Sequence, residues 1–241
     1  MSRKKLKTIG ILGGMGPEAT AYFFEQLVRA TAAGTDQDHP PVIVYSLPQI
    51  PDRTGAILHG GRSPLPFLRR GLRALERAGA DFVVMPCVTA HYYYPRIAAR
   101  SPLPVLNLLG ETLAEVKRLR PIPESIGLVA TAGTVRSGLV SGLFEAAGIR
   151  VILPSAGDQQ RITAAIYGKK GIKAGQTSGR PREAVLSVSL ELVRRGAGAI
   201  MAGCTELPLV LHASDLPVPL VEPMAIGARA AIRLSGASLK P

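Results

Sequence analysis

Two cysteines are the side chains of this 241-residue chain whose type and spacing best suit catalysis. Cys87 follows the apolar run FVVMP and Cys204 follows AIMAG, and the two residues lie 117 positions apart (204 − 87). The runs IGIL and IGLV, which begin at Ile9 and Ile126, have the same separation (126 − 9). The chain therefore reads as two half-length copies of one unit, each of which delivers a thiol near the end of a buried strand.

A pair of thiols can exchange a proton at carbon without a cofactor. A thiolate is a competent general base near neutral pH, and a neutral thiol is a competent acid. Each cysteine precedes a threonine and a pattern that could start a helix, whose N-terminus would favour the thiolate. Racemisation would need the two thiols on opposite faces of a planar carbanion. Free cysteines are also common inert core residues, so a purely structural role stays open.

The charge that grows on a carbanion's carboxylate needs hydrogen-bond donors. Candidate donors are the glycine-rich turns and four threonines, which could equally be simple helix caps: Thr89, Thr131, Thr134 and Thr205. Arg53, in PQIPDRT, could bind a carboxylate through two parallel hydrogen bonds or lie in a solvated loop paired with Asp52. Lys173 could add a second cation. Glu206 could orient Cys204 or cap a helix, and His91 fits a structural role.

Strand and helix signals alternate along the chain. Strands are predicted at Ile9–Leu12, Val42–Ser46, Phe82–Met85, Val105–Asn107, Ile126–Val129, Val151–Leu153, Ala199–Met201 and Val218–Leu220. Helices are predicted at Pro17–Ala33, Arg62–Arg77, Thr89–Ala99, Glu111–Leu119 and Thr134–Ala147, then in a segment that ends at Ile166, and at Arg182–Arg195 and Met224–Leu234. Continuous apolar strands between amphipathic helices predict parallel sheets that are covered on both faces.

The predicted fold class is α/β, with two subdomains related by a pseudo-twofold axis and a candidate site in the cleft between them. Each subdomain would be a mostly parallel sheet flanked by helices, over residues 1–108 and 109–222, with a C-terminal helix near 223–236 packing back on the first. Ligands bind at the carboxyl ends of strands in such sheets, where Gly13, Gly14, Cys87, Thr131 and Cys204 fall. The segment 155–182 is rich in Gly, Lys and Gln, has the least clear pattern of the chain, and could be a lid over the cleft.

Composition argues against several classes of protein. The net charge of +12 could suit nucleic acid, but the cations fall in separate segments without a recognisable binding motif, so no nucleic-acid partner is expected. No long apolar run or signal peptide is read, which predicts no membrane contact, and two cysteines suit reduced thiols in the cytoplasm. Dispersed histidines and no CxxC predict no metal. GGMGPEAT does not complete a dinucleotide fingerprint, and no cofactor is expected.

Five motifs together resemble the aspartate/glutamate racemase family: IGILGGMGPEAT, PQIPDRT, MPCVTAH, IGLVATAGT and GCTELPL. They occur in order from about Thr8 to Glu222. The resemblance implies a cofactor-independent amino-acid racemase, commonly a dimer, closest to aspartate racemase, with Cys87 and Cys204 as the acid and base. It also implies a substrate site formed by Met15, Gln49, Arg53, Thr89, Thr131, Gly133, Thr134, Lys173 and Thr205.

Val88 departs from the family pattern, which has asparagine after the first cysteine. An asparagine amide would hydrogen-bond the substrate, whereas valine has no polar atom. The expected substrate is aspartate, or else glutamate. Two alternatives stay open: another substrate on the same scaffold, as in hydantoin racemases or maleate isomerases, and an acidic amino-acid-binding protein with weak catalysis.

Overall fold

The computed structural model describes residues 5–240 and divides the chain into two compact units. Unit 1 consists of the chain up to Pro51, Ser63–Glu111 and the chain from Met224 onward. Unit 2 consists of Asp52–Arg62 and Thr112–Pro223. The subdomain boundaries predicted from the sequence stay a prediction, and the first residues of the basic N-terminal stretch lie outside the described range.

Unit 1 is built on a three-stranded parallel sheet of order β2-β1-β3. Its strands are β1 (Ile9–Gly13), β2 (Val42–Ser46) and β3 (Phe82–Val84). Every residue of the central strand β1 is buried, because helices cover both faces of the sheet. In register, Ile9 lies beside Val42 on one side and Phe82 on the other.

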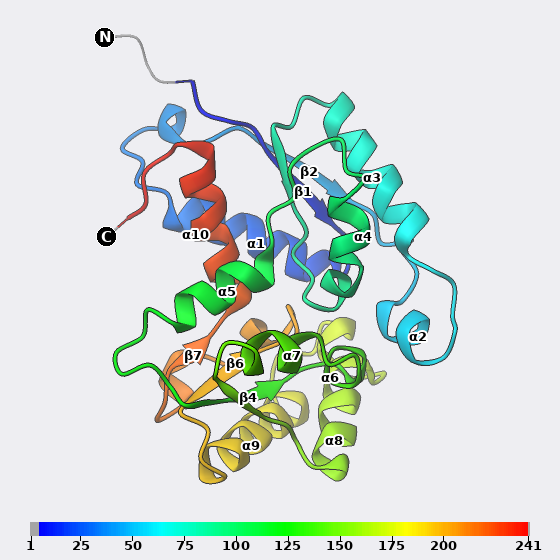
Figure 1. Cartoon of the computed structure of the whole chain (residues 1–241), viewed down its shortest axis with the longest axis vertical. Helices are drawn as coiled ribbons and strands as arrows, with labels where there is room; N and C mark the ends of the chain where they lie inside the picture. The colour runs from blue at the N-terminus through cyan, green and yellow to red at the C-terminus, as the bar shows by residue number, and fades with distance from the viewer. Residues whose placement is uncertain (1–4, 241) are drawn as a thin grey trace. The chain divides into compact units, whose positions relative to one another are not determined.

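Helices of unit 1 form two layers around this sheet (Figure 1). They are α1 (Pro17–Ala30), α3 (Leu65–Arg77), α4 (Tyr94–Ala98) and α10 (Pro223–Ser235). Helix α5 (Leu108–Val116) begins in unit 1, and its residues from Thr112 onward belong to unit 2. Figure 1 shows α1 and α10 on one side of β1 and β2, with α3 and α4 on the other. Leu12 of β1 reaches α3 at Gly71, where a Cβ would lie 2.4 Å from a Leu12 methyl. The predicted apolar stripe of α3 is buried, as in an amphipathic helix over a sheet.

Unit 2 is built on a four-stranded parallel sheet of order β5-β4-β6-β7. Its strands are β4 (Ser125–Val129), β5 (Arg150–Ile152), β6 (Ala199–Ala202) and β7 (Leu220–Val221). The helices are α2 (Arg53–Leu58), α6 (Ala132–Arg136), α7 (Leu139–Glu145), α8 (Ala156–Tyr167) and α9 (Arg180–Arg194). Both units therefore contain parallel sheets flanked by helices, as the sequence predicts.

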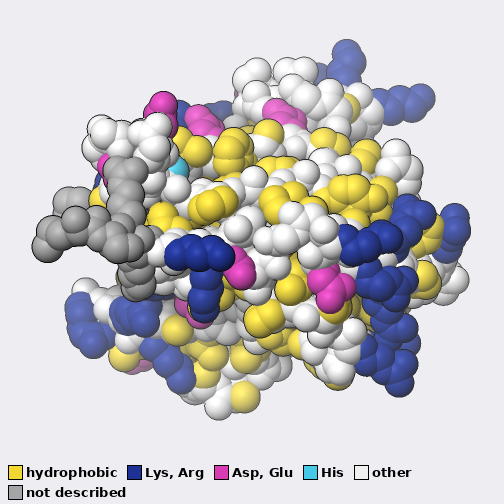
Figure 2. Space-filling model, turned by 90° about the horizontal axis from the view of Figure 1, so that it is seen from above, with side chains coloured by type: hydrophobic (Ala, Val, Ile, Leu, Met, Phe, Trp, Pro, Cys, Tyr) yellow, Lys and Arg dark blue, Asp and Glu magenta, His cyan; other side chains and the backbone are white. Residues whose placement is uncertain are grey.

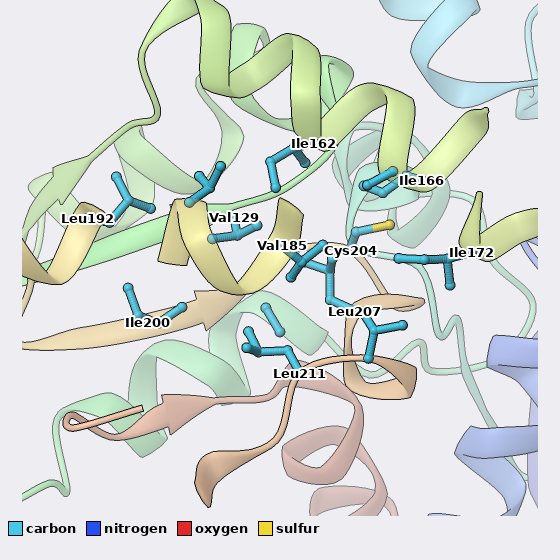
Figure 3. Close-up of a cluster of buried hydrophobic side chains, with 14 of the residues drawn as sticks. Val129, Ile162, Ile166, Ile172, Val185, Leu192, Ile200, Cys204, Leu207 and Leu211 are labelled. Atoms are coloured by element: carbon cyan, nitrogen blue, oxygen red, sulfur yellow. The ribbon is translucent and has the colours of Figure 1, made fainter. Parts of the chain in front are cut away.

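The core of unit 2 lies where α8 and α9 pack together over β4 and β6. Figure 3 shows the side chains of this cluster, with Val129 and Ile200 from the sheet and Val185 and Leu192 from α9. Cys204 lies within the same cluster, and its sulfur points toward Ile166 and Ile172. Apolar packing thus continues up to the candidate thiol.

The structure differs from the predicted elements in several places. Helix α2 was not predicted, and its six residues RTGAIL include a glycine, which has a low helix propensity. The predicted helix Thr134–Ala147 is two helices, α6 and α7, separated by Gly138 at φ +67°, where glycine is favoured. Helix α8 agrees with the helical segment predicted to end at Ile166, whereas the 3-10 turn at Ile172–Ala174 was not predicted. The predicted strand at Val105 is a single bridge to Val83.

Surface charge is unevenly distributed on the face shown in Figure 2. Lys and Arg side chains gather along the margin of that face, while apolar side chains occupy much of its middle. Three arginines of helix α3 are exposed: Arg70, Arg73 and Arg77. Among the helices of residues 5–240, none combines the length and the apolar character that crossing a membrane requires.

Candidate functional site

The two cysteines occupy equivalent places in the two sheets. Cys87 follows β3 and Gly14 follows the neighbouring strand β1, whereas Cys204 follows β6 and Thr131 follows the neighbouring strand β4. In each sheet the first strand connects to a neighbour on one side, and the chain then returns to the strand on its other side. The two strands between which this direction reverses mark a topological switch point. Open parallel sheets bind ligands at such points. Both cysteines are free thiols and both are buried.

The Cys87 turn of unit 1 is held in place by a buried histidine. His91 Nδ1 lies 2.9 Å from the carbonyl oxygen of Cys87, and the Leu108 N–H donates to His91 Nε2 at 3.2 Å. Since Nε2 accepts, the proton is on Nδ1, which donates to Cys87. Burial lowers the pKa of His91, so the ring is neutral. The predicted structural role of His91 agrees with these contacts.

The GGMGP turn of unit 1 is fitted against the chain that follows β2. Gly14 has φ +89°, and a Cβ there would lie 2.4 Å from the Leu47 backbone, so only glycine fits. Thr20 secures the turn by accepting from the Gly14 N–H at 2.8 Å and donating to the Gly16 carbonyl at 2.7 Å. Of the predicted substrate-binding residues nearby, Met15 is buried and Gln49 is exposed.

The Cys204 thiol of unit 2 belongs to a chain of polar contacts. Its Sγ donates to Glu206 Oε2 at 2.9 Å, and the other carboxylate oxygen, Oε1, is paired with Lys173 Nζ. The Glu206 side chain is only 3% exposed and that of Lys173 is 23% exposed. Thr205, also buried, donates to Glu206 Oε2 at 3.4 Å. Glu206 therefore orients Cys204, which was one of its two predicted roles.

Electrostatics keep Cys204 protonated in this arrangement. Burial raises its pKa well above the usual value, the negative charge and hydrogen bond of Glu206 raise it further, and Lys173 opposes them. The chain after Cys204 forms only a short 3-10 turn, Leu207–Leu209, rather than an α-helix. The expectation that a helix N-terminus would favour the Cys204 thiolate is therefore wrong.

Thr131 and Thr134 lie at the start of α6, beyond the end of β4. Thr131 is the N-cap of this helix: its hydroxyl accepts from the Thr134 N–H at 3.4 Å and lies 3.2 Å from the Thr134 hydroxyl. Both side chains are buried. Gly133 lies between them and permits a close approach of α2, because a Cβ there would lie 2.7 Å from the Thr54 hydroxyl oxygen and 2.9 Å from its Cα.

Arg53 is the first residue of α2 and is only 8% exposed, so it is not a solvated loop residue. Asp52 caps this helix by accepting from the Gly55 N–H. Tyr167, at the end of α8, donates to Asp52 Oδ1 at 3.3 Å, and its oxygen lies 3.2 Å from the Thr54 hydroxyl. Cys204 and Arg53 both act electrostatically on the Tyr167 pKa, so these groups are neighbours in unit 2.

The structure thus divides the predicted site residues between the units. Unit 1 contains Met15, Gln49, Cys87 and Thr89, and unit 2 contains Arg53, Thr131, Gly133, Thr134, Lys173, Cys204 and Thr205. Within residues 5–240, no group of three or more His, Cys, Asp or Glu side chains could hold a metal ion. Thr54 and Tyr167 were not predicted as part of the site, and Asp52 was predicted only as a possible partner of Arg53. The D-x-x-G spacing before α2 is the one local signal, typical of an Asp cap.

The family model and the relatives that this chain resembles are all described as racemases. The family model described as Asp/Glu/Hydantoin racemase matches residues 12–231. The broad specificity amino-acid racemase RacX of Bacillus subtilis (strain 168) is 27% identical over 230 residues, which cover 93% of this chain and 96% of RacX. The aspartate racemase of Picrophilus torridus is 31% identical, covers 97% of this chain and 96% of its own, and superposes with a TM-score of 0.86.

A more distant solved structure shares the fold alone. Glutamate racemase from Francisella tularensis subsp. tularensis SCHU S4 is 16% identical to this chain and superposes with a TM-score of 0.67. The match covers 96% of this chain and 81% of that one. The arrangement of two parallel α/β sheets is therefore common to chains whose sequences have diverged widely.

Proposed function

Because the chain belongs to the Asp/Glu/hydantoin racemase family and is an amino-acid racemase, an isomerase, we propose that it acts on aspartate or glutamate by cofactor-free proton exchange between two thiols. The observation that carries this proposal is the placement of one buried thiol at the switch point of each sheet. The named aspartate racemase relative supports aspartate as the first substrate to test.

In the proposed reaction, Cys204 is the resting acid, because its environment favours the thiol. The role of base then falls to Cys87. The Cys87 thiolate removes the Cα proton, the carbanion is stabilised by donors at its carboxylate, and Cys204 delivers a proton to the opposite face. The two sulfurs exchange protonation states in one turnover, so no proton is gained or lost overall. This mechanism requires both sulfurs to reach the same carbon.

Arg53 and Lys173 of unit 2 supply the proposed recognition of the side-chain carboxylate of an acidic substrate. Arg53 offers a planar fork for the side-chain carboxylate, and Lys173 can add a donor while it remains beside Glu206. Thr89, Thr131 and Thr205 would bind the α-carboxylate. A cytoplasmic location and a homodimer stay predictions of the sequence and its resemblance.

Removal of both thiols tests the proposed chemistry. We expect Cys87→Ser and Cys204→Ser each to lower racemisation of aspartate by about 10²–10⁴-fold, because proton transfer by a positioned group contributes about that much. Circular dichroism would follow the inversion, and proton NMR in D₂O would follow exchange at Cα. Ala202→Ser is the matched control, since it also places a hydroxyl in the buried end of β6 but removes no thiol. Normal Cα exchange by the double variant would refute the two-thiol mechanism.

A broad-specificity amino-acid racemase is the second candidate. Val88, which is only 1% exposed, offers no polar side-chain atom beside Cys87, and the relative RacX carries the broad-specificity name. A panel of both enantiomers of aspartate, glutamate, alanine and lysine, with a hydantoin, separates the candidates. Acid-selective turnover supports the first proposal, and comparable kcat/KM values across the amino acids support the second.

A further inference from the structure

The segment that carries Arg53 is docked on unit 2, although the chain on either side of it belongs to unit 1. Asp52–Arg62 is the part of the chain that crosses over. Its helix α2 packs against α6, and the close approach occurs where Thr54 meets Gly133. A short helix of six residues has little stability of its own, so its position depends on what holds it.

Tyr167 makes two hydrogen bonds to this segment, one on each side of Arg53. Its hydroxyl donates to Asp52 Oδ1 at 3.3 Å, so its one proton is used, and the Thr54 hydroxyl at 3.2 Å must donate to the Tyr167 oxygen. Partial burial raises the pKa of Tyr167, which keeps the phenol protonated throughout the pH range of an assay. Both hydrogen bonds join positions more than 110 residues apart in the sequence.

The same side chain also lies beside the second candidate cation. Lys173 Nζ is 5.8 Å from the centroid of the Tyr167 ring, within the range of a cation–π contact. Lys173 is in turn paired with Glu206, the partner of Cys204. Tyr167 therefore touches both the Arg53 segment and the Lys173–Glu206 pair, through its hydroxyl and its ring respectively.

We propose that Tyr167 is a positioning residue that fixes α2 on unit 2, so that Arg53 is presented to the side-chain carboxylate of the substrate and acidic amino acids are preferred over neutral ones. This inference rests on the proposed function, because it assumes that the enzyme racemises an acidic amino acid. It assigns a role in specificity to a residue that takes no part in proton transfer. Loss of the hydroxyl should weaken carboxylate binding and leave the thiols unaffected.

The Tyr167→Phe variant tests the proposal, because it removes the hydroxyl and keeps the ring beside Lys173. We expect its KM for aspartate to rise about 5- to 10-fold, as loss of two modest hydrogen bonds predicts, with kcat unchanged within about 2-fold. For alanine, the KM of the variant should stay within about 2-fold of the parent value. If alanine is not turned over, its inhibition constant should stay within the same limit. Tyr45→Phe is the matched control, since Tyr45 lies on β2 of unit 1 and its hydroxyl has no hydrogen-bond partner among residues 5–240.

Hydrogen exchange gives a second measurement that needs no substrate. Amide exchange at Arg53–Leu58 should be faster in Tyr167→Phe than in the parent protein, and faster still in Gly133→Ala, where a new Cβ displaces Thr54. Unchanged exchange in both variants would overturn the proposal, as would an equal fall in kcat for every substrate. Failure of the parent protein to racemise either acid would instead refute the proposed function, whatever the exchange rates show.

Discussion

At the scale of single residues, the two cysteines are held by different hydrogen bonds. Cys204 is buried among apolar side chains and donates to a carboxylate, whereas the carbonyl of Cys87 accepts a hydrogen bond from a neutral histidine. The sequence predicts the positions of both thiols, because each follows a continuous apolar strand. It also offers Glu206, two positions on, as a partner that could orient Cys204, but it could not predict that Lys173, 33 positions away, pairs with Glu206. Such contacts depend on packing between elements distant in the sequence.

Glu206 should control the reactivity of Cys204. In a Cys87→Ser background, iodoacetamide should alkylate Cys204 slowly at pH 7, because thiolate is the reactive form and burial with Glu206 disfavours it. Glu206→Gln removes the negative charge, so the pKa of Cys204 should fall and the alkylation rate at pH 8 should rise at least about 3-fold, since a tenfold change in thiolate fraction corresponds to one pKa unit. Mass spectrometry of the intact protein from pH 6 to 10 would measure the rates.

Lys173→Met provides the opposite control for that experiment. Lys173 lowers the pKa of Cys204, so its removal should raise the pKa and slow alkylation at pH 8. If the substitutions instead changed access of iodoacetamide to the thiol, the alkylation rates of both variants would change in the same direction. The maximum rate reached at high pH would change as well. Two variants that alkylate alike, with the same pH midpoint as the parent, would show that the Glu206 pair does not govern Cys204.

At the scale of elements, the apolar runs predict the strands of both sheets closely, since strands buried on both faces have a continuous signal. The errors occur where local and tertiary effects compete. Gly138 interrupts an otherwise helical pattern by adopting a positive φ, and α2 exists because unit 2 supplies a surface for it rather than through its own propensity. Tyr167 was missed for the same reason, because its partners Asp52 and Thr54 are remote in sequence.

The junction between the Cys87 turn and α5 should make stability depend on pH through His91. Its folded pKa lies below 6.5, so the unfolded state binds the extra proton, and stability is complete above pH 6.5 and is lost as pH falls below it. We expect the free energy of unfolding in urea to fall by up to about 1.4 kcal/mol per pH unit between pH 6.5 and 5. His91→Gln, which has no titrating group, should flatten this slope.

His59→Gln is the control for this prediction, since His59 is exposed and should leave the slope unchanged. Titration of Asp215 does not interfere with this measurement. Arg182 lowers the pKa of Asp215 to about 2, so the contribution of Asp215 to the free energy of unfolding changes only below about pH 4. If the parent protein and His91→Gln show the same slope from pH 6.5 to 5, His91 is not the group responsible.

At the scale of the whole molecule, the two halves repeat one plan. The orders β2-β1-β3 and β5-β4-β6-β7 both have the first strand of the unit in the interior, the second on one side and the third on the other. The third strand of each unit leads to a cysteine. This repetition was predicted from the equal 117-residue separations, because a duplicated unit preserves spacing as well as pattern. The two cations proposed to bind the substrate are not duplicated, since Arg53 and Lys173 both belong to unit 2.

Net charge should make turnover of acidic substrates sensitive to salt. The chain carries a formal charge of +12, and arginines are exposed along α3. A positive field attracts an amino acid with a net negative charge and has little effect on one with no net charge. Raising NaCl from 10 to 500 mM should therefore lower kcat/KM for aspartate by about 3-fold or more through screening. Alanine, whose net charge is zero at pH 7, should change by less than about 1.5-fold, and this difference separates screening from a general effect of salt on the protein. Equal losses for both amino acids would show that the surface charge plays no part in attracting the substrate.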